Sequence, residues 1–290
     1  MTLRFAWLTL ALSLWAFSPA RGQQADHVEL AFLNVGQGDA IVIRSPEGKV
    51  AIIDAGSGLL GRRLRRMGVD TIQLAIATHP HSDHIGGMAE LMLNFTMLNY
   101  MDNGVPHTTS TYSHLMYTLR RDPKITYLEA TERTIRLGSV ALHIIPPPPS
   151  SLPPGERVAG DDGLNNQSIG VVVEFGEFRA LLTGDSEVEE LNYFLTRGVP
   201  QVTVLKAAHH GSRDAVTPAW LSATKPEVVV ISVGRNNEYG HPHPWALRYY
   251  EATAKEIFRT DLHGDVTILG NRDGTYEVIT GRREGGGGRS

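Results

Sequence analysis

The chain has 290 residues, of which 41% are apolar and 20% charged, so it is long enough for one large globular domain or two small ones. It contains no cysteine, which excludes disulfides, thiolate metal sites and a cysteine nucleophile. Its formal net charge of −4 gives no overall basic surface, so a nucleic-acid partner would need a local positive patch.

The N-terminal segment has the layout of a secretory signal peptide. Arg4 precedes the apolar run 5–17, and small residues follow it. We predict cleavage after Ala20 or Gly22, which removes residues 1–22 and makes the protein secreted or periplasmic. The alternative is an uncleaved membrane anchor, but the run is short for a membrane span. If cleavage occurs, no stable membrane anchor remains.

The most informative stretch follows a predicted buried strand at 74–77 and precedes the pair Gly86-Gly87, which predicts the opening of a helix. Four of the six positions between 79 and 84 carry groups that bind first-row metals: His79, His81, Asp83 and His84. The first two histidines are two residues apart on an extended segment and can point the same way. The other two residues can face a second centre. We interpret this stretch as a metal site.

Strands are also predicted in the first half at 28–32, 40–44, 49–54, 135–137 and 140–145, and helices at 61–67 and 110–121. Asp39 and Asp54 lie at strand ends, where an acid can orient a metal-bound histidine through a hydrogen bond. We favour that supporting role for Asp54 and turn chemistry for Asp39. A proline-rich connection then leads to Asn165 and is interpreted as a long surface loop.

The second half repeats the pattern of apolar strands followed by polar residues. Strands at 171–175 and 178–182 lead to Thr183-Gly184-Asp185, a strand at 202–205 leads to His209-His210, and a strand at 228–231 precedes His241-Pro242-His243-Pro244. Ser186 and Glu189 predict a capping box at the start of a helix. Because several strands end in candidate ligands or acid–base groups, we expect these ends to form one rim.

These residues suffice for two metal ions. His79 and His81 can hold one, Asp83, His84 and His209 a second, and Asp185 can bridge them. Two cations roughly 3.5–4 Å apart lower the pKa of a bridging water toward neutrality and clamp the attacking and leaving oxygens. Histidine with carboxylate suits zinc, and manganese or iron also fits. The resulting metal-bridging hydroxide suits hydrolysis of an ester, amide or phosphodiester.

At these motifs the sequence resembles a known family. H-x-H-x-D-H after a strand, an aspartate in D-A-G, a later T-G-D and a final histidine are similar to the metallo-β-lactamase superfamily. More narrowly, six ordered motifs resemble the extracytoplasmic hydrolase domain of the ComEC competence proteins. They are F-L-N-V-G-Q-G-D-A at 32–40, T-H-P-H-S-D-H-I-G-G at 78–87, N-N-Q-S at 165–168, L-L-T-G-D at 181–185, L-K-A-A-H-H-G-S at 205–212 and Y-G-H-P-H-P at 239–244. The chain would be a stand-alone exported relative, without that family's many membrane spans.

The resemblance implies an α/β fold, a single-domain αββα sandwich with the metals at one edge. No shift in composition marks a second domain, so we expect one domain over 23–284 and a flexible glycine-rich tail at 285–290. The resemblance also implies a set of metal ligands, namely His79, His81, Asp83, His84, Asp185 and His209, with Asp54 supporting them from behind.

One feature departs from the general superfamily pattern. No histidine occurs in a recognisable motif between the first metal motif and Thr183-Gly184-Asp185, and the ComEC-like group has N-N-x-S there. We therefore expect Asn165, Asn166 or Ser168 to face the site and to support a less fully ligated first metal. The catalytic candidates are Asp83, His210 and His241. The two histidines could protonate the leaving group or contact the substrate, and purely structural roles are equally open to them.

We therefore predict an exported dinuclear metal-dependent hydrolase, zinc being the favoured metal, that acts on a phosphodiester. DNA is a candidate substrate, because the resemblance is to a family linked to DNA uptake and nuclease activity. The acidic charge weighs against DNA. The alternatives are a hydrolase of another ester, a β-lactam or a phosphocholine-type group, and a non-catalytic binding protein on the same fold. The intact ligand set weighs against the last.

Overall fold

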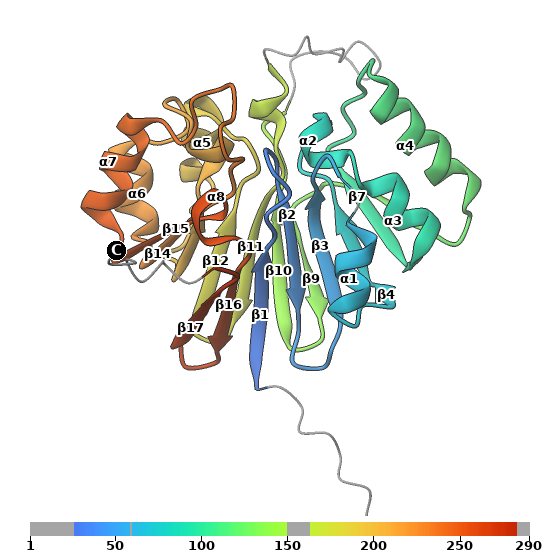
Figure 1. Ribbon diagram of the computed structural model, residues 1–290, viewed down its shortest axis with the longest axis horizontal. Coiled ribbons are helices and arrows are strands. Elements are labelled where there is room, and N and C mark those ends of the chain that lie inside the picture. The colour runs from blue at the N-terminus through green and yellow to red at the C-terminus, as the bar shows by residue number, and fades with distance from the viewer. Residues whose placement is uncertain (1–25, 59, 150–162, 283–290) are drawn as a thin grey trace, which may run out of the picture.

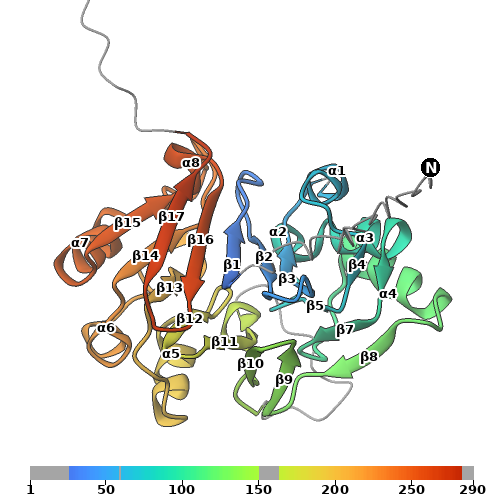
Figure 2. The ribbon, with the colours of Figure 1, turned by 90° about the horizontal axis from the view of Figure 1, so that it is seen from below.

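Two β-sheets packed face to face form the body of the molecule. The computed structural model describes residues 26–58, 60–149 and 163–282. Within these residues one sheet has eight strands, the other has seven, and a small two-stranded sheet completes the set. Helices cover the outer faces of both large sheets (Figures 1 and 2). The predicted single-domain αββα sandwich is therefore confirmed.

The eight-stranded sheet combines an antiparallel half with a parallel half. Its strands are β1 (His27–Phe32), β2 (Ala40–Arg44), β3 (Val50–Ala55), β5 (Leu74–Ile76), β7 (Asn99–Asp102), β8 (Thr126–Glu129), β16 (Val266–Asn271) and β17 (Tyr276–Thr280). They lie in the order β17-β16-β1-β2-β3-β5-β7-β8. Pairs from β17 to β3 are antiparallel, and pairs from β3 to β8 are parallel.

The seven-stranded sheet has the same division. Its strands are β9 (Arg133–Leu137), β10 (Val140–Ile145), β11 (Gly170–Phe175), β12 (Phe178–Leu182), β13 (Val204–Lys206), β14 (Val228–Ile231) and β15 (Glu256–Arg259). Strands β9 to β12 pair in antiparallel fashion, and β12 to β15 are parallel. The carboxyl ends of the parallel strands consequently meet at one edge, where open α/β sheets place their sites.

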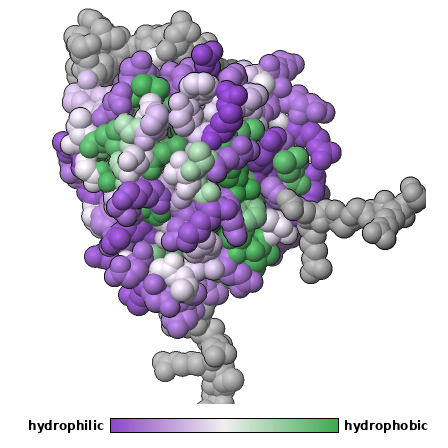
Figure 3. Space-filling view, turned by 90° about the vertical axis from the view of Figure 1, so that its left-hand side faces the viewer, coloured by the Kyte–Doolittle hydropathy of each residue, from purple (hydrophilic) through white to green (hydrophobic). Residues whose placement is uncertain are grey.

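Helices flank the sandwich on both sides. Those beside the eight-stranded sheet are α1 (Gly61–Arg66), α3 (Met88–Asn94) and α4 (Ser110–Arg121), and those beside the seven-stranded sheet are α5 (Val188–Thr196), α6 (Pro218–Thr224) and α7 (Pro244–Thr253). The short elements are β4 (Thr71–Ile72), β6 (Thr96–Met97), α2 (Ser82–Ile85), α8 (Thr260–His263) and the 3-10 turns η2 (Asn165–Gln167) and η3 (Ala208–Gly211). Figure 3 faces α6 and α7 and shows hydrophilic residues with separate apolar patches between them.

Apolar side chains form three layers, one between the sheets and one beneath each set of helices. Along β3, Ile53 packs between the sheets while Ile52 packs under the helices. Along β11, Val171 packs between the sheets and Val172 packs on the helix side. Because both faces of the inner strands are covered, their sequences are nearly continuous apolar runs rather than alternating ones.

Most of the predicted elements match the observed ones closely. The strand at 40–44 and the helix at 110–121 have the predicted bounds. The helix predicted to open at Gly86-Gly87 is α3, which begins at Met88 with Gly87 as its N-cap residue, and the short helix α2 that comes before it was not predicted. Asp83 lies in the first turn of α2.

The predicted capping box between Ser186 and Glu189 is wrong. Helix α5 begins at Val188, and its N-cap residue Glu187 makes no side-chain capping hydrogen bond. The buried Ser186 hydroxyl instead lies 2.7 Å from Glu190 Oε2. Burial raises the pKa of the Glu190 carboxyl well above its ordinary value. The segment after β12 is thus tied to α5 through a buried carboxyl group.

Three predictions concern segments that lie wholly or mostly outside the described residues. They are the signal peptide at 1–22, the tail at 285–290 and most of the proline-rich connection. Among the residues that the structure does describe, no helix combines the length and the apolar character needed to cross a membrane.

The turn at 34–39 approaches the loop at 79–84 very closely. The Asp39 amide donates a hydrogen bond to the Asp83 carbonyl at 3.2 Å. Gly38 has a φ of +124°, and a Cβ atom added there would lie 2.2 Å from the same carbonyl oxygen. Gly36 also has a positive φ, of +83°, but a Cβ atom added to it would meet nothing within 4 Å. A side chain at Gly36 would therefore meet backbone strain alone, whereas a side chain at Gly38 would meet both strain and a steric clash.

We expect Gly38→Ala to destabilise the protein by roughly 2–4 kcal/mol, because both backbone strain and a backbone clash must be relieved. Gly36→Ala is the matched control and is expected to cost about 1–2 kcal/mol, from strain alone. Denaturant unfolding of the two variants measures the difference. Equal losses of unfolding free energy in the two variants would show that the close contact between Gly38 and the Asp83 carbonyl does not contribute to stability.

Candidate metal centre

Four side chains from three segments meet at the edge where β5, β12 and β13 end (top of Figure 1). Asp83 and His84 lie on α2, Asp185 follows β12, and His210 lies on η3. Each offers one ligand atom, and the four atoms lie within 4.8 Å of one another. We call these residues the four-residue cluster. The structure thus brings together strand ends that the sequence predicts to share a rim.

The Oδ2 atom of Asp185 lies at the centre of this cluster. His84 Nε2 is 3.1 Å from it and His210 Nε2 is 3.2 Å from it. The other oxygen of the same carboxylate, Oδ1, lies 3.6 Å from the Lys206 ammonium group. One carboxylate oxygen therefore faces the imidazoles, and the other faces a fixed cation.

His79 and His81 form a pair beside the cluster. His79 Nε2 lies 2.9 Å from His81 Nδ1, and the His79 ring centroid lies 4.1 Å from that of His84. Burial, reinforced by the nearby His84, lowers the pKa of His79 well below its ordinary value, and burial also lowers the pKa of His81. Both imidazoles are consequently neutral near pH 7, the form in which histidine binds metal.

The carboxylates of the cluster hold protons on its two histidines. Burial opposes a charge on His210, but Asp185 and Asp83 raise its pKa to about 10. Burial also opposes a charge on His84, yet Asp185 and Asp54 raise its pKa well above the ordinary value. The positive charge that these protons bring offsets buried negative charge, which is the task a bound cation performs.

The buried atoms of the cluster fit divalent cations. Within the described residues, His84 Nε2, His210 Nε2 and Asp185 Oδ1 are buried without a hydrogen-bond partner. Buried polar atoms are normally paired, and an orphaned group in a folded protein calls for a ligand or ion. Imidazole nitrogens with carboxylate oxygens make a donor set that accepts zinc, manganese or iron.

Asp54 lies directly behind the cluster. Its carboxylate accepts hydrogen bonds from the Thr78 amide at 2.8 Å and the Thr78 hydroxyl at 2.7 Å. The same carboxylate lies 2.8 Å from His84 Nδ1, so it orients the ring whose Nε2 faces Asp185. This is the geometry of the supporting role predicted for Asp54, in which one ring nitrogen is fixed so that the other can ligate.

Asp39 and Lys206 form a second buried pair, which no motif in the sequence predicts. These residues form an ion pair in which both side chains are almost fully buried. Lys206 Nζ also donates to the Gly184 carbonyl at 2.8 Å. Asp39, for which turn chemistry was favoured, thus closes a turn and also carries buried charge at the site. Lys206 lies at the end of an apolar strand, and the sequence does not indicate which acidic residue it pairs with in the folded protein.

His209 and His210 occupy different surroundings although they are adjacent. Both have positive φ angles, of 44° and 53°, and this unusual turn directs His210 into the cluster. His209 Nε2 lies 3.9 Å from Asp185 Oδ2, while its Nδ1 lies 3.3 Å from Glu187. His209 groups instead with Glu187 and Asp214. The structure thus places His210 where the sequence analysis placed His209, whose ligand role stays a prediction.

The N-N-Q-S segment lies beside the site. Ser168 Oγ accepts a hydrogen bond from the Asp185 amide at 3.2 Å and lies 3.5 Å from His79 Nδ1. Asn165 donates to Glu187 at 2.8 Å, and Asn166 accepts from the Glu187 amide at 2.9 Å. Ser168 therefore contacts both predicted halves of the centre, and the two asparagines fix the entry into α5.

A cavity of about 540 Å³ opens above these residues. Its wall includes side chains from the cluster and from more distant segments, among them Gln37, His107, Thr109, Tyr239 and His241. The His107 ring centroid lies 6.1 Å from that of His81. No motif surrounds His107 in the sequence, so only the path of the loop before α4 shows that it reaches the site.

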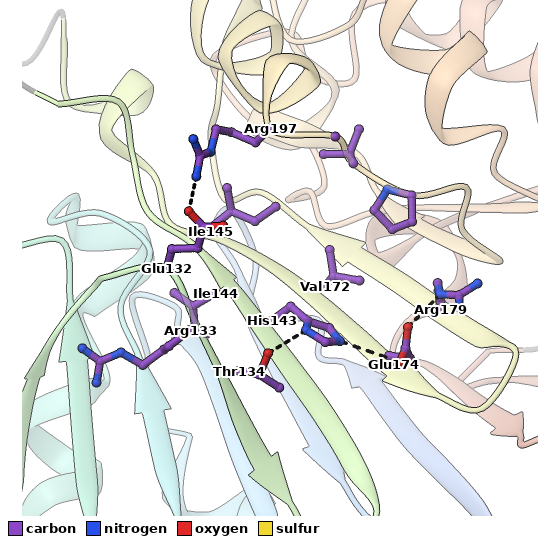
Figure 4. A pocket seen from close by; sticks show the side chains of 13 residues that line it. Glu132, Arg133, Thr134, His143, Ile144, Ile145, Val172, Glu174, Arg179 and Arg197 are labelled. Atoms are coloured by element: carbon purple, nitrogen blue, oxygen red, sulfur yellow. Dashed lines mark hydrogen bonds and ion pairs between the residues drawn. The ribbon is translucent and has the colours of Figure 1, made fainter.

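A separate cavity of about 450 Å³ lies on the seven-stranded sheet and shares no lining residue with the first (Figure 4). A row of polar contacts crosses four strands there, linking Arg179, Glu174, His143 and Thr134. Two of its arginines are paired with glutamates, Arg179 with Glu174 and Arg197 with Glu132. None of the candidate metal groups found among the described residues lies in it.

The fold and this site agree with comparisons to known proteins. The model of the metallo-beta-lactamase superfamily matches residues 33–235, more than half of the chain, so the protein belongs to this superfamily. Among solved structures, the metallo-beta-lactamase fold protein YhfI from Bacillus subtilis superimposes with a TM-score of 0.55 at 9% identity. That match covers 87% of this chain and 100% of the other, and it supports the fold alone.

Two curated relatives confirm the resemblance to the ComEC-like group. ComE operon protein 3 of Bacillus subtilis (strain 168) is 26% identical over 281 residues, which cover 86% of this chain and 34% of the relative. Recombination protein 2 of Haemophilus influenzae is 26% identical over 245 residues, which cover 81% of this chain and 28% of the relative. The chain thus spans about a third of the length of these relatives.

We expect His210→Ala to weaken metal binding by more than the roughly 10–100-fold that loss of a supporting residue costs, because the cluster loses a ligand atom. His209→Ala is the matched control at the adjacent position and should weaken it less. Competition with a chromophoric chelator measures both affinities. A larger loss in His209→Ala would assign the ligand role to His209 and contradict the geometry.

Proposed function

We propose that this protein is an exported, dinuclear metal-dependent hydrolase that cleaves phosphodiesters. The observation that carries the proposal is the position of Asp185 Oδ2, which faces His84 and His210 at 3.1 and 3.2 Å. The neutral pair His79 and His81 lies immediately beside them. A carboxylate placed between two sets of ligands is suited to hold two cations a few ångströms apart.

Two divalent cations bound there would supply a nucleophile from water near neutral pH and stabilise the charge that develops on the phosphate oxygens. Neighbouring residues of the protein orient the candidate metal ligands. Asp54 fixes the orientation of His84, and Lys206 faces the Asp185 oxygen that points away from the imidazoles. These two candidate ligands, His84 and Asp185, are thus held from behind, so little reorganisation of them is needed during the reaction.

The surroundings of the two catalytic candidates His210 and His241 support a different role for each. His210 Nε2 faces both Asp185 and Asp83 within the cluster, which supports a role as ligand. Burial, together with His209, lowers the pKa of His241 to about 4, so its imidazole is neutral near pH 7. A neutral ring donates a hydrogen bond to a phosphate oxygen but is a poor acid, which supports substrate contact for His241.

The ordered ComEC-like motifs and the cavity above the four-residue cluster favour a phosphodiester as the substrate. Imidazoles of His81, His107, His209 and His241 line its wall, and they can donate hydrogen bonds to an anionic substrate. The N-terminal layout of Arg4 followed by an apolar run supports export.

We expect metal-loaded protein to hydrolyse bis-p-nitrophenyl phosphate and single-stranded DNA, and Asp185→Ala to lower kcat/KM by at least about 100-fold. The loss follows from removing the carboxylate between the two ligand sets. Asp273→Ala, on the exposed turn between β16 and β17, is the matched control and should retain activity.

The same preparation tested on nitrocefin and on a phosphocholine ester separates the alternative substrates. Failure to turn over either phosphodiester with any of zinc, manganese or iron would defeat the proposal. Faster turnover of nitrocefin would keep the metal centre and change the substrate class.

A further inference from the structure

A further cavity opens next to the metal centre, on the other side of His241. Its volume is about 580 Å³, and His241 lines both it and the cavity above the cluster. It is lined by polar and charged residues of the loop 234–241 and of the β15–α8 junction, chiefly Arg235, Asn236, Asn237, Arg259 and Asp261. A substrate that occupies the metal centre can therefore extend past His241 into a second polar compartment.

The loop 234–241 is held in one shape by its own contacts. The Gly234 amide donates to Gln37 Oε1 at 3.1 Å, which ties the start of the loop to the turn after β1. Asn237 Nδ2 donates to the carbonyls of Gly234 at 3.0 Å and His241 at 2.6 Å, and the His241 amide donates to Asn237 Oδ1 at 3.0 Å. Side chains that point outward from such a loop are positioned before a ligand arrives, which lowers the cost of binding.

The second cavity carries an uncompensated positive charge. The Arg259 guanidinium donates to both oxygens of Asp261, at 3.0 and 2.7 Å, so these two charges offset each other. Arg235 is exposed and makes no hydrogen bond or ion pair with another described residue. Glu238 is exposed on the same loop but lines neither cavity. Arg235 is thus available to an anionic group.

Tyr239 presents an aromatic ring beside His241, the residue that lines both cavities. It is 70% exposed, and it lines the cavity above the metal centre. Its ring stacks on His241 with centroids 5.8 Å apart and planes 27° apart. A single exposed tyrosine needs no functional explanation on most surfaces. Here the ring is supported on one side by a residue of the site, which leaves the other side for an aromatic ligand.

We propose that the loop 234–241 forms a subsite for the nucleotide adjacent to the scissile phosphodiester. Tyr239 stacks on the base of that nucleotide, and Arg235 pairs with its phosphate. Base stacking on an aromatic platform beside a cationic group is the general means of holding an unpaired strand without sequence preference. The inference rests on the proposed phosphodiesterase function and extends it, since it assigns a single-stranded oligonucleotide that fills both cavities as the preferred substrate.

The experiment is a fluorescence anisotropy titration of the metal-loaded protein with a labelled, phosphorothioate-linked oligothymidylate, which resists cleavage. We expect Tyr239→Ala to raise the Kd about 5–100-fold, and Tyr239→Phe, which keeps the ring, to leave it unchanged. Arg235→Ala should raise the Kd and reduce the slope of log Kd against log salt concentration by about 0.7, the value for one phosphate contact on a single strand.

Two variants serve as matched controls. Tyr117→Ala removes a tyrosine that is 57% exposed on α4, and Arg133→Ala removes an exposed arginine that lines the cavity of Figure 4. Both should bind the oligothymidylate as the unaltered protein does. Thermal melts verify that each variant is folded.

Wild-type binding that is absent, or that is equal in Tyr239→Ala, Arg235→Ala and the controls, would overturn the subsite. Turnover of bis-p-nitrophenyl phosphate by the wild-type protein is measured in parallel. Because anisotropy needs no cleavage, loss of oligothymidylate binding in the variants supports binding of a single strand by the loop 234–241 even if that turnover fails. Absent turnover defeats the phosphodiesterase function and, with it, the position of the loop beside a scissile bond.

Discussion

Buried negative charge at one edge of the sandwich is the constraint on which the rest of the site depends. The carboxylates of Asp39, Asp54 and Asp185 are each at most 2% exposed. Removing such groups from water costs several kcal/mol per charge unless opposite charge and hydrogen bonds replace the solvent. Lys206 provides one permanent positive charge among them. The remaining negative charge is offset by protons on His84 and His210 or by a bound cation, so this edge is the candidate metal centre.

The topology explains why the charges meet there. Each sheet has a parallel half, and the parallel strands β5, β12 and β13 end on the same side. The polar residues of the cluster follow these strands within a few positions of the chain. Asp83 and His84 on α2 follow β5, Asp185 follows β12, and His210 on η3 follows β13. Close backbone approaches hold these ends in place. A Cβ atom on Gly184 would lie 2.7 Å from Thr78 Oγ1, so the strand end that carries Asp185 packs directly on the one that carries His79.

Local patterns in the sequence predicted most of the strands and the position of most candidate ligands, because apolar strands and the residues after them are contiguous in the chain. The sandwich itself was implied by the resemblance to the metallo-β-lactamase superfamily. Pairings between distant segments could not be predicted in this way. Asp39 and Lys206 become partners only when β1 and β13 are brought to one edge, and His107 reaches the cavity only through the path of its loop. The choice between His209 and His210 depends on two successive positive φ angles, which no pattern of residue types specifies.

We propose that the Asp185 carboxylate is shared between two metal ions. Metal stoichiometry measures this most directly, by inductively coupled plasma mass spectrometry of the purified protein and of Asp185→Asn, which keeps the size of the side chain and removes its charge. We expect about two divalent ions per chain in the wild-type protein and loss of both in the variant. A wild-type protein that binds no metal, or a variant with an unchanged metal content, would contradict it.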